Sequence, residues 1–377
     1  MAAAIRFARA ALARHGIDPR AVAVIASLDK KSDEPALHAV AEALGAPFRV
    51  FDAAALAAQE PHLTRPSEIV RAAVGVAGVA EAAALAAAGD DGRLIVPKEV
   101  NGQLTLAIAE AATPILPLPG RSRGHLAIVG IGPGTPAWRT AETVALLARA
   151  DAFVGYCLYL DLVEDLRAEK PRHDFALGDE AARTRFALEL AGEGRTVALI
   201  SSGDAGIYAM ASLAAELLDT GEISDAARRV DLTVAPGVSA AQAAAARVGA
   251  PLGHDFAFIS LSDLLTPWPA IVRRLSAAAE ADFVVALYNP RSRRRTTQLE
   301  EAKAIFAAAR PPETPVVIAA SLGRPAEAIT HTTIGAFDPA AVDMLATVII
   351  GASTTRRFTR GDGRVIVYTP RGYEVVP

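Results

Sequence analysis

Apolar residues along the chain are gathered into short runs that are bounded by turn residues. Before residue 114, these runs alternate with alanine-rich stretches that have helical spacing. The predicted strands of this part are residues 21–26, 48–51, 94–97 and 104–108. The alternation predicts a small α/β unit over residues 1–113.

A longer series of Val, Ile and Leu-rich runs follows residue 124, and continuous apolar runs are typical of strands covered on both faces by helices. The predicted strands are residues 126–129, 152–155, 197–201, 231–235, 257–261, 283–287, 316–319 and 346–350. Eight strands exceed what one sheet of five or six needs, so we expect two α/β lobes, 125–237 and 238–377, with a cleft between them. Residues 114–124 contain three prolines and two glycines, which predicts a linker.

Composition narrows the class of protein further. The 377 residues carry a net charge of −4 and no strongly basic half, which argues against a nucleic-acid partner. Much of the 52% hydrophobic content is alanine. The sequence shows no run of 18 strongly apolar residues and no pattern of a secretory leader, so we expect no membrane segment. Cys157 is the only cysteine, and the seven histidines lack ligand spacing, so we expect neither disulfide nor metal site. These features predict a cytoplasmic α/β protein.

The segment from Gly130 to Thr135 follows the predicted strand 126–129 directly. Glycines at a strand end let backbone amides approach a ligand closely. A dinucleotide-binding fingerprint would place glycine where this chain has Thr135, and Pro133 removes an amide that would face a pyrophosphate. A nucleotide-type ligand and a plain strand-to-helix turn both remain open for this motif alone.

Two further strands end in small residues. Ser202-Gly203-Asp204 follows strand 197–201, and Pro236-Gly237-Val-Ser239-Ala240 follows strand 231–235. Asp204 alone is equally typical of a helix cap. Because open α/β sheets bind ligands at the carboxyl ends of their strands, three such turns together predict one shared pocket.

Charged and polar residues follow two strands of the last lobe. The run Arg291 to Arg295 comes after strand 283–287, and its guanidinium groups would suit a substrate with several carboxylates, although such runs are usually solvated faces. Ser262 and Asp263 follow strand 257–261, where they are also typical of a helix cap, and Trp268 could serve packing alone.

The strand-end motifs resemble, in order and spacing, the tetrapyrrole (corrin/porphyrin) methylase family. The motifs that carry the resemblance are Gly130-x-Gly132-Pro133-Gly134, Ser202-Gly203-Asp204, Pro236-Gly237-Val-Ser239-Ala240 and Leu287-Tyr288-Asn289. The resemblance implies two α/β domains that bind S-adenosylmethionine in the cleft between them, in a homodimer. It places the cofactor contacts on Gly132, Pro133, Ser202, Gly203, Asp204, Ile207, Ser239, Ala240, Asn289 and Gly323.

Longer motifs are similar to the members of this family that methylate precorrin-3B at C17 in cobalamin biosynthesis. They are Gly155-Tyr156-x-x-Tyr159-x-Asp161-Leu162, Gly253-His254-Asp255-Phe256, the segment 260–268, and Tyr288-Asn-Pro-Arg-Ser292. This resemblance implies methyl transfer with ring contraction to precorrin-4. Acid–base helpers are expected among His254, Asp263 and Asp204, and carboxylate-binding groups among Arg291, Arg293 and Arg294. A cobalt-containing substrate, a non-corrin acceptor and a corrin carrier are the alternatives.

Residues 1–112 resemble a different cobalamin-pathway module, the C-terminal domain of the cobalt-precorrin lactone hydrolase. The resemblance rests on the segments 26–35, 75–83 and 96–98. That family usually opens with a strand and a Gly/Cys/Arg-rich turn, whereas this chain starts at a predicted helix over residues 3–15. The pairing of two such modules suggests that intermediates are handed on between neighbouring pathway enzymes.

Overall fold

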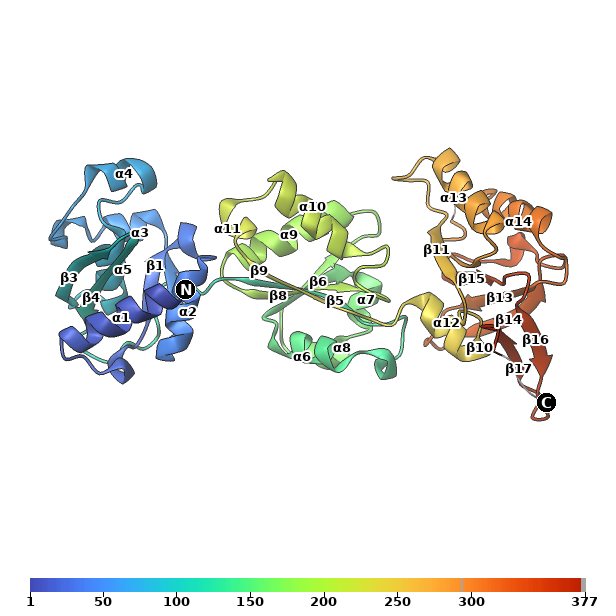
Figure 1. The fold of residues 1–377 in the computed structure, drawn as a ribbon, viewed down its shortest axis with the longest axis horizontal. Coiled ribbons are helices and arrows are strands. Elements are labelled where there is room, and N and C mark those ends of the chain that lie inside the picture. Colours follow the sequence, from blue (N-terminus) through green and yellow to red (C-terminus); the bar gives the residue numbers. More distant parts are fainter. Residues whose placement is uncertain (293, 374–377) are drawn as a thin grey trace.

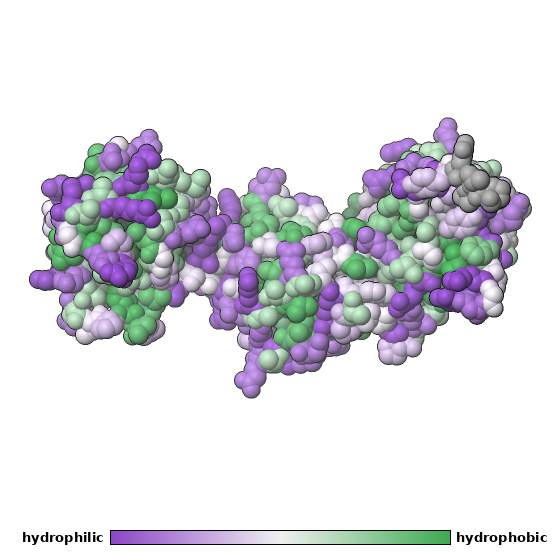
Figure 2. All heavy atoms as spheres, turned by 60° about the horizontal axis from the view of Figure 1, so that its bottom comes forward, coloured by the Kyte–Doolittle hydropathy of each residue, from purple (hydrophilic) through white to green (hydrophobic). Residues whose placement is uncertain are grey.

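Three lobes lie one after another along the long axis of the computed structural model, which describes residues 1–292 and 294–373 (Figure 1). The lobes remain distinguishable when all atoms are drawn, and the face in Figure 2 mixes polar residues with apolar patches. Helices and strands alternate in each lobe, so the predicted α/β class is confirmed.

The N-terminal lobe packs its helices against a parallel strand pair and an antiparallel hairpin. Its elements are α1 Ala2–Arg14, β1 Ile25–Leu28, α2 Pro35–Leu44, β2 Phe48–Phe51, α3 Ala53–Ala57, α4 Glu68–Val74, α5 Val79–Ala88, β3 Arg93–Asn101 and β4 Leu104–Glu110. Helix α5 contacts β1, β3 and β4, and its Ala82 and Ala83 are buried beside Leu28. The prediction of a strand over 21–26 is wrong, because the side chain of Asp18 caps a short 3₁₀ turn at Pro19–Ala21 and delays the strand.

The predicted linker contains no helix or strand between residues 111 and 124, but specific contacts hold it on both sides. The backbone of Arg121 pairs with Val50 in an isolated bridge, and its guanidinium donates to the carbonyl oxygen of Gly192. Arg229 of the middle lobe forms a 3.0 Å ion pair with Asp33. The segment therefore connects the first two lobes and is held in place by specific contacts with both.

The middle lobe is built on a five-stranded parallel sheet of order β7-β6-β8-β5-β9. Its strands are β5 His125–Gly130, β6 Ala152–Tyr156, β7 Arg172–Phe175, β8 Thr196–Ser201 and β9 Asp231–Ala235. Its helices are α6 Ala141–Arg149, α7 Cys157–Asp161, α8 Glu164–Arg167, α9 Glu180–Gly192, α10 Met210–Thr220 and α11 Asp225–Arg228. Alternate residues of β5 enter two cores: Leu126 packs with α9 and α10, whereas Ala127 packs with α6.

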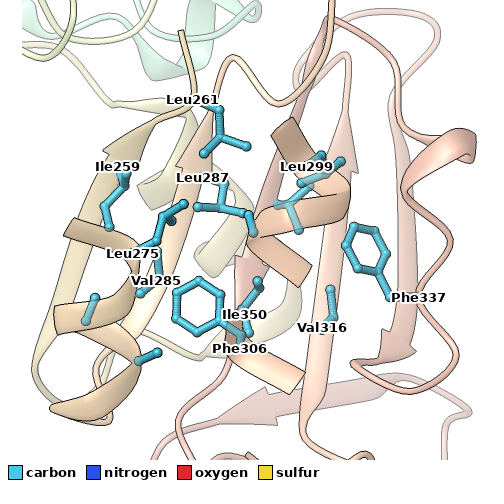
Figure 3. Packing of buried hydrophobic residues seen from close by; sticks show 14 of the residues in the cluster. Ile259, Leu261, Leu275, Val285, Leu287, Leu299, Phe306, Val316, Phe337 and Ile350 are labelled. Atoms are coloured by element: carbon cyan, nitrogen blue, oxygen red, sulfur yellow. The ribbon is translucent and has the colours of Figure 1, made fainter. Parts of the chain in front are cut away.

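The C-terminal lobe is built on a mixed five-stranded sheet of order β11-β12-β15-β13-β14, in which only the β11–β12 pair is parallel. Its strands are β11 Phe256–Ser260, β12 Val284–Tyr288, β13 Pro315–Ala320, β14 Ala328–Thr333 and β15 Ala346–Ile350. Its helices are α12 Ala240–Val248, α13 Trp268–Glu280 and α14 Gln298–Ala309. Leu275 and Phe306 cover one face of this sheet, where they meet Leu287 (Figure 3). Helix α12 covers the other face.

A small sheet of order β10-β17-β16 completes the C-terminal lobe, with β10 at Gly249–Ala250, β16 at Arg356–Thr359 and β17 at Val365–Tyr368. These three strands, together with β7 and β14, were not predicted. Strands β7, β14 and β16 carry polar residues among their apolar ones, and every residue of β16 is exposed, so no continuous apolar run marks them. Strand β10 has only two residues, and β17 is a short apolar run that was missed. Short 3₁₀ turns also occur at Asp29–Lys31, Glu60–His62, Pro136–Trp138 and Pro339–Ala341.

No single helix of residues 1–292 and 294–373 is long and apolar enough to cross a membrane; α4 and α5 satisfy length and composition only as a pair bent by 75°. Within the same residues, no group of three or more His, Cys, Asp or Glu side chains could hold a metal ion.

Candidate active site

Three strand-end loops of the middle lobe are packed into one cluster at the carboxyl edge of its sheet. Gly132 follows β5, Gly203 follows β8, and Gly237 follows β9. The N–H of each of Gly132 and Gly203 donates to the carbonyl of the other, at 3.1 and 2.9 Å. A Cβ on Gly237 would lie 2.1 Å from the carbonyl oxygen of Gly203, so only glycine fits there.

Asp204 ties two of these loops together. Its Oδ1 accepts the N–H of Gly206 at 2.8 Å, and its Oδ2 accepts the N–H of Gly237 at 2.9 Å. Both carboxylate oxygens are thereby engaged by backbone donors. The geometry gives Asp204 a positioning role in the loop cluster.

The cluster continues into the C-terminal lobe through Ser239 and Tyr288. Ser239 is buried and caps α12 in a capping box with Gln242. The hydroxyl of Tyr288, at the end of β12, donates to Ser239 Oγ and accepts the N–H of Ala241, each at 3.1 Å. Burial raises the pKa of Tyr288, so the hydroxyl keeps its proton and remains a donor.

Tyr208 makes a second connection between the two lobes. It has a left-handed backbone (φ +52°), and its hydroxyl donates to the carbonyl of Phe258 at 2.8 Å and accepts the N–H of Ser260 at 3.2 Å. Its hydroxyl therefore continues the backbone hydrogen bonding at the edge of β11. Asn289, also left-handed (φ +50°), donates from its side chain to Ser260 Oγ at 3.0 Å.

A loop that follows β13 closes on the first glycine turn. A Cβ on Gly323 would lie 2.7 Å from the backbone nitrogen of Thr135, and one on Gly134 would lie 2.5 Å from the carbonyl oxygen of Leu322. Arg324 donates to the carbonyl of Pro133 at 3.2 Å. Loops from both lobes thus form one surface made mainly of glycines, hydroxyls and backbone groups, with the Asp204 carboxylate and the Arg324 guanidinium as its charged members.

A separate hollow of about 440 Å³ lies on the outer side of the 236–238 loop, next to α12. It is lined by Trp138, Thr140, Pro236, Gly237, Val238, Gln242, Ala243 and Ala246. None of the residues predicted to contact the cofactor lines it.

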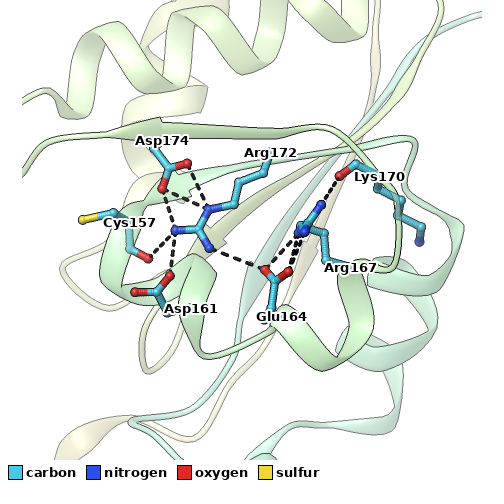
Figure 4. A network of polar contacts seen from close by, with 7 residues as sticks. All are labelled: Cys157, Asp161, Glu164, Arg167, Lys170, Arg172 and Asp174. Carbon is cyan, nitrogen blue, oxygen red and sulfur yellow. Dashed lines mark hydrogen bonds and ion pairs between the residues drawn. The ribbon is translucent and has the colours of Figure 1, made fainter.

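Arg172 organises the edge of the middle sheet beside α7 (Figure 4). Its guanidinium contacts Asp174 and Asp161 at 2.7 Å and Glu164 at 3.5 Å. The hydrogen bonds that the guanidinium donates to Asp174, and then those to Asp161, raise the pKa of Arg172 although burial opposes them. Asp161, one of the motif residues, is therefore an ion-pair partner that holds α7 in place.

The family of the chain follows from the comparison with known sequences. Residues 125–338 match the family model described as Tetrapyrrole (Corrin/Porphyrin) Methylases. The chain belongs to this family. Residues 2–109 match a second model, described as Cobalamin synthesis G C-terminus, as the resemblance of the N-terminal part implied.

Two curated relatives align with this chain over nearly their whole length. The probable cobalt-factor III C(17)-methyltransferase of Salmonella typhimurium is 46% identical over 66% of this chain and 99% of its own. The precorrin-3B C(17)-methyltransferase of Sinorhizobium sp. is 44% identical over 66% of this chain and 97% of its own. A solved structure, that of the methyltransferase CobJ, is 37% identical with a TM-score of 0.61, covering 66% of this chain and all of the other. The two-lobed methylase fold predicted from the motifs is confirmed.

The structure of this methylase brings most of the predicted cofactor residues together. The Ser202 hydroxyl lies 3.4 Å from the carbonyl of Gly132, and Ala240 is the first residue of α12. The predicted residues that lie in these loops are Gly132, Pro133, Ser202, Gly203, Asp204, Ser239, Ala240, Asn289 and Gly323. Ile207 is half-buried beside Tyr208. Tyr208 itself was not among the residues predicted to contact the cofactor.

The predicted acid–base helpers do not share one place. Asp263 lies just beyond the carboxyl end of β11, where its Oδ2 accepts from Gln298 at 2.9 Å. His254 lies before the amino end of the same strand, exposed, with Nδ1 2.8 Å from the N–H of Asp255. At about 3.3 Å per residue, the strand separates it from Ser260 by roughly 20 Å. The structure therefore leaves His254 away from the loop cluster.

The arginines of the basic run after β12 differ in their contacts. Arg291 donates to the carbonyl of Pro339 at 3.0 Å, Arg294 is exposed, and Arg293 lies outside the described residues. Arg295, which ends the predicted run but was not one of its three named candidates, is buried and donates to the carbonyl of Asn289 at 2.9 Å. Burial lowers the pKa of Arg295, and Asp263 at 3.8 Å offsets part of that cost.

Arg183 is a second cation that sequence reasoning missed. It lies in the first turn of α9, on the sheet edge of the loop cluster, with 3% of its side chain exposed. Its Nη2 contacts Met210 Sδ at 3.2 Å, while Nε and Nη1 have no hydrogen-bond partner in the described part of the chain. Burial lowers the pKa of Arg183. The sequence did contain a signal for this buried arginine. Arg183 precedes the buried Ala187 by four residues, which places it on the apolar stripe of α9.

Proposed function

We propose that the chain transfers a methyl group from S-adenosylmethionine to C17 of precorrin-3B, or of its cobalt-containing counterpart, in cobalamin biosynthesis. The observation that carries this proposal is the 44–46% identity to two C(17)-methyltransferases over almost their entire length. The two identities are too close to favour either substrate. Methyl transfer is therefore proposed for both, and both are tested.

The loop cluster fits S-adenosylmethionine as cofactor. Glycines at 132, 203 and 237 let backbone groups approach a ligand without side chains, and the buried hydroxyl of Ser201 has no hydrogen-bond partner among the described residues. The carboxylate of Asp204 accepts a backbone N–H on each oxygen, and the other groups of the cluster are mainly backbone groups and hydroxyls, which leaves the sulfonium methyl open to attack. The bound cofactor supplies an electrophilic methyl group.

The chain's own contribution is positioning. Tyr288 holds the capped end of α12, and Tyr208 holds the loop after β8 against β11, so loops of both lobes keep one geometry. Holding two reactants in line contributes roughly 7–11 kcal/mol to lowering a barrier. We place the macrocycle next to these hydroxyls, with its carboxylates on Arg183, Arg291 and Arg294.

Ring contraction to precorrin-4 is part of the proposal. Loss of the C20 hydroxyl proton and departure of the lactone oxygen call for proton transfer. Asp263 is the proposed proton acceptor, since it follows the same strand end as Ser260 and its Oδ1 faces Arg295. Homodimer formation, a cytoplasmic location, hand-off to neighbouring pathway enzymes and lobe boundaries at 113, 124 and 237 are also proposed.

The test is methyl transfer from labelled S-adenosylmethionine, with precorrin-3B and cobalt-factor III offered in parallel and the product mass as readout. We expect label in a contracted macrocycle from one substrate at least. Tyr288→Phe is expected to slow transfer, whereas Tyr373→Phe, at an exposed position, serves as the matched control. Bound cofactor without label transferred to either macrocycle would refute the proposal and favour a carrier or another acceptor.

A further inference from the structure

The N-terminal lobe contains a groove of about 870 Å³ between α1 and β3. Its floor includes Ala3, Phe7 and Ala10, which recur at helical spacing on α1. The opposite face of the same helix, with Ala8 and Leu12, is buried in the lobe. Helix α1 therefore has a second apolar face that opens into the groove.

Positive charge surrounds this apolar floor. Residues 1–120 contain 11 Lys and Arg against 13 Asp and Glu, so the lobe as a whole is slightly acidic. The groove reverses this balance, because four of the cations line it and Glu99 is its single acidic residue. The four cations are Arg6, Arg14, Arg65 and Lys98.

The one carboxylate of the groove is already neutralised. Glu99 contacts Arg14 and lies 2.9 Å from Nε2 of His15. Hydrogen bonds from His15 and then Arg14 lower the pKa of Glu99. Arg6, Arg65 and Lys98 have no carboxylate within 4.0 Å in the part of the chain that the structure describes, so three positive charges remain unpaired.

A buried carboxylate fixes the wall that carries two of these cations. Glu81 is 2% exposed and accepts the N–H of Lys98 at 2.8 Å, and the N–H and hydroxyl of Thr64 at 2.8 and 2.6 Å. The register of β3 shifts between Val96 and Glu99, which frees the Lys98 amide for this bond. Glu81 thus holds the main chain at Lys98 and beside Arg65 through neutral donors, and leaves both side-chain charges unpaired.

We propose that this groove binds an amphiphilic polycarboxylate macrocycle, with its flat apolar face against Phe7 and its rim carboxylates on Arg6, Arg65 and Lys98. A small inorganic anion would leave the apolar floor of the groove uncovered, and an uncharged ligand would leave its cations without partners, so neither fits the groove. The volume lies within the range of roughly 300–1,000 Å³ typical of small-molecule sites. The identity of the macrocycle, a corrin intermediate on the route of the methylase, rests on the proposed function.

The test uses the full chain and uroporphyrin III, an octacarboxylate macrocycle that fluoresces. Arg65→Glu combined with Lys98→Glu is expected to weaken its binding at least tenfold. Arg93→Glu reverses a charge on the same strand outside the groove and is expected to change it less than twofold. An octaglutamate peptide, which carries the charge without the ring, is expected to bind much more weakly. Unchanged affinity in the double variant, or equal binding of the peptide, would overturn the inference.

A second measurement does not depend on the stability of the double variant. The two tryptophans, Trp138 and Trp268, lie outside the N-terminal lobe. Phe7→Trp adds a fluorophore to the groove floor, and uroporphyrin III should quench the added emission. Unquenched emission would overturn the inference whatever the behaviour of the double variant.

Methyl transfer measured on the same preparations separates this inference from the proposed function. At saturating substrate, the double variant should retain the wild-type rate, because neither residue belongs to the loop cluster. Groove-dependent binding without methyl transfer in any preparation would refute the proposed function and leave the groove as a macrocycle site. Methyl transfer without groove-dependent binding would refute the groove alone.

Discussion

The loop cluster of the methylase lobes and the groove of the N-terminal lobe are built on opposite principles. The cluster presents glycines, hydroxyls and backbone groups, and its carboxylate, Asp204, is engaged on both oxygens. The groove presents three unpaired cations over an apolar floor. One region is specified by how closely main chains approach, and the other by charge.

This difference predicts how each region fails. Where two main chains are packed against each other, a single added carbon atom cannot be accommodated, because the neighbouring atoms could make room only if a strand end moved. Charge-based binding tolerates changes of shape but responds to charge reversal and to salt. Three variants and two changes of condition, taken from the largest expected effect to the smallest, sharpen this comparison.

The largest effect is expected for Gly237→Ala. Its Cβ would lie 2.1 Å from the carbonyl oxygen of Gly203, so the loops must separate, and overpacking of this kind costs about 1–3 kcal/mol. We expect methyl transfer to fall at least a hundredfold and uroporphyrin III binding in the groove to persist. The control is Gly361→Ala, where a Cβ has no atom within 4 Å. A Gly237→Ala variant with wild-type methyl transfer would contradict the steric basis of the site.

The next effect is expected at Glu81 in the N-terminal lobe. Glu81→Gln replaces an acceptor oxygen by a donor facing donors, which costs about 1–3 kcal/mol. Faster hydrogen exchange at the Thr64 and Lys98 amides would measure it. Glu110→Gln, on exposed β4, is the control, and equal exchange in both variants would show that Glu81 does not hold the groove wall.

Glu81 also gives the wild type a pH dependence. Burial alone would raise the pKa of Glu81, but hydrogen bonds from Thr64 and Lys98 outweigh it and hold the pKa below its unfolded value. Its stabilisation is therefore fully present above about pH 4.3, the unfolded value, and is lost as the pH falls through the lower folded pKa. Glu81→Gln should abolish this acid loss of exchange protection at Thr64.

A smaller effect is expected for Tyr208→Phe. The hydroxyl makes two hydrogen bonds to the edge of β11, and each contributes about 0.5–1.5 kcal/mol. We expect kcat/KM for methyl transfer to fall roughly tenfold, with little change in global stability because the ring is half-exposed. Tyr373→Phe is again the control. An unchanged kcat/KM would mean that the contact between the lobes is dispensable for the reaction.

The smallest effect distinguishes the two regions without a mutation. Raising the salt from about 50 to 500 mM shortens the Debye length from roughly 14 to 4 Å. Uroporphyrin III binding in the groove should weaken severalfold, whereas binding of S-adenosylhomocysteine, measured by calorimetry, should change less than twofold. Equal salt sensitivity of both ligands would remove the distinction drawn between neutral and charged recognition.

Strands buried on both faces were predictable from the sequence. The apolar runs of β5, β8 and β15 match such strands. The strands β7 and β16 lack such a run; both lie at sheet edges, where no residue of β7 is fully buried and every residue of β16 is exposed. The lobe boundaries at 113, 124 and 237 stay predictions.

The candidate site divides in the same way. Loops at 130–134, 202–206 and 236–240 could be predicted to meet, since parallel strands end at one edge of a sheet. The contacts of Tyr208, Arg295 and Arg183 could not, because they depend on how the chain folds. Tyr208 meets Phe258 far along the sequence, Arg295 turns back to the carbonyl of Asn289, and two nitrogens of Arg183 have no hydrogen-bond partner among the described residues. His254 lies before the amino end of β11, and a motif position near a strand does not specify which end of that strand faces the loop cluster; its acid–base role stays a prediction.

Local chemistry in the sequence was sufficient to specify which strands of the middle lobe end in glycine-containing turns, because turns depend on neighbouring residues alone. It was also sufficient to place the chain in its family. The tertiary structure alone decided that Asp204 joins two loops, that Arg295 supports Asn289, and that cations gather over the second apolar face of α1. The physical reason is that hydrogen bonds and unpaired charges are properties of neighbours in space, and packing determines those neighbours.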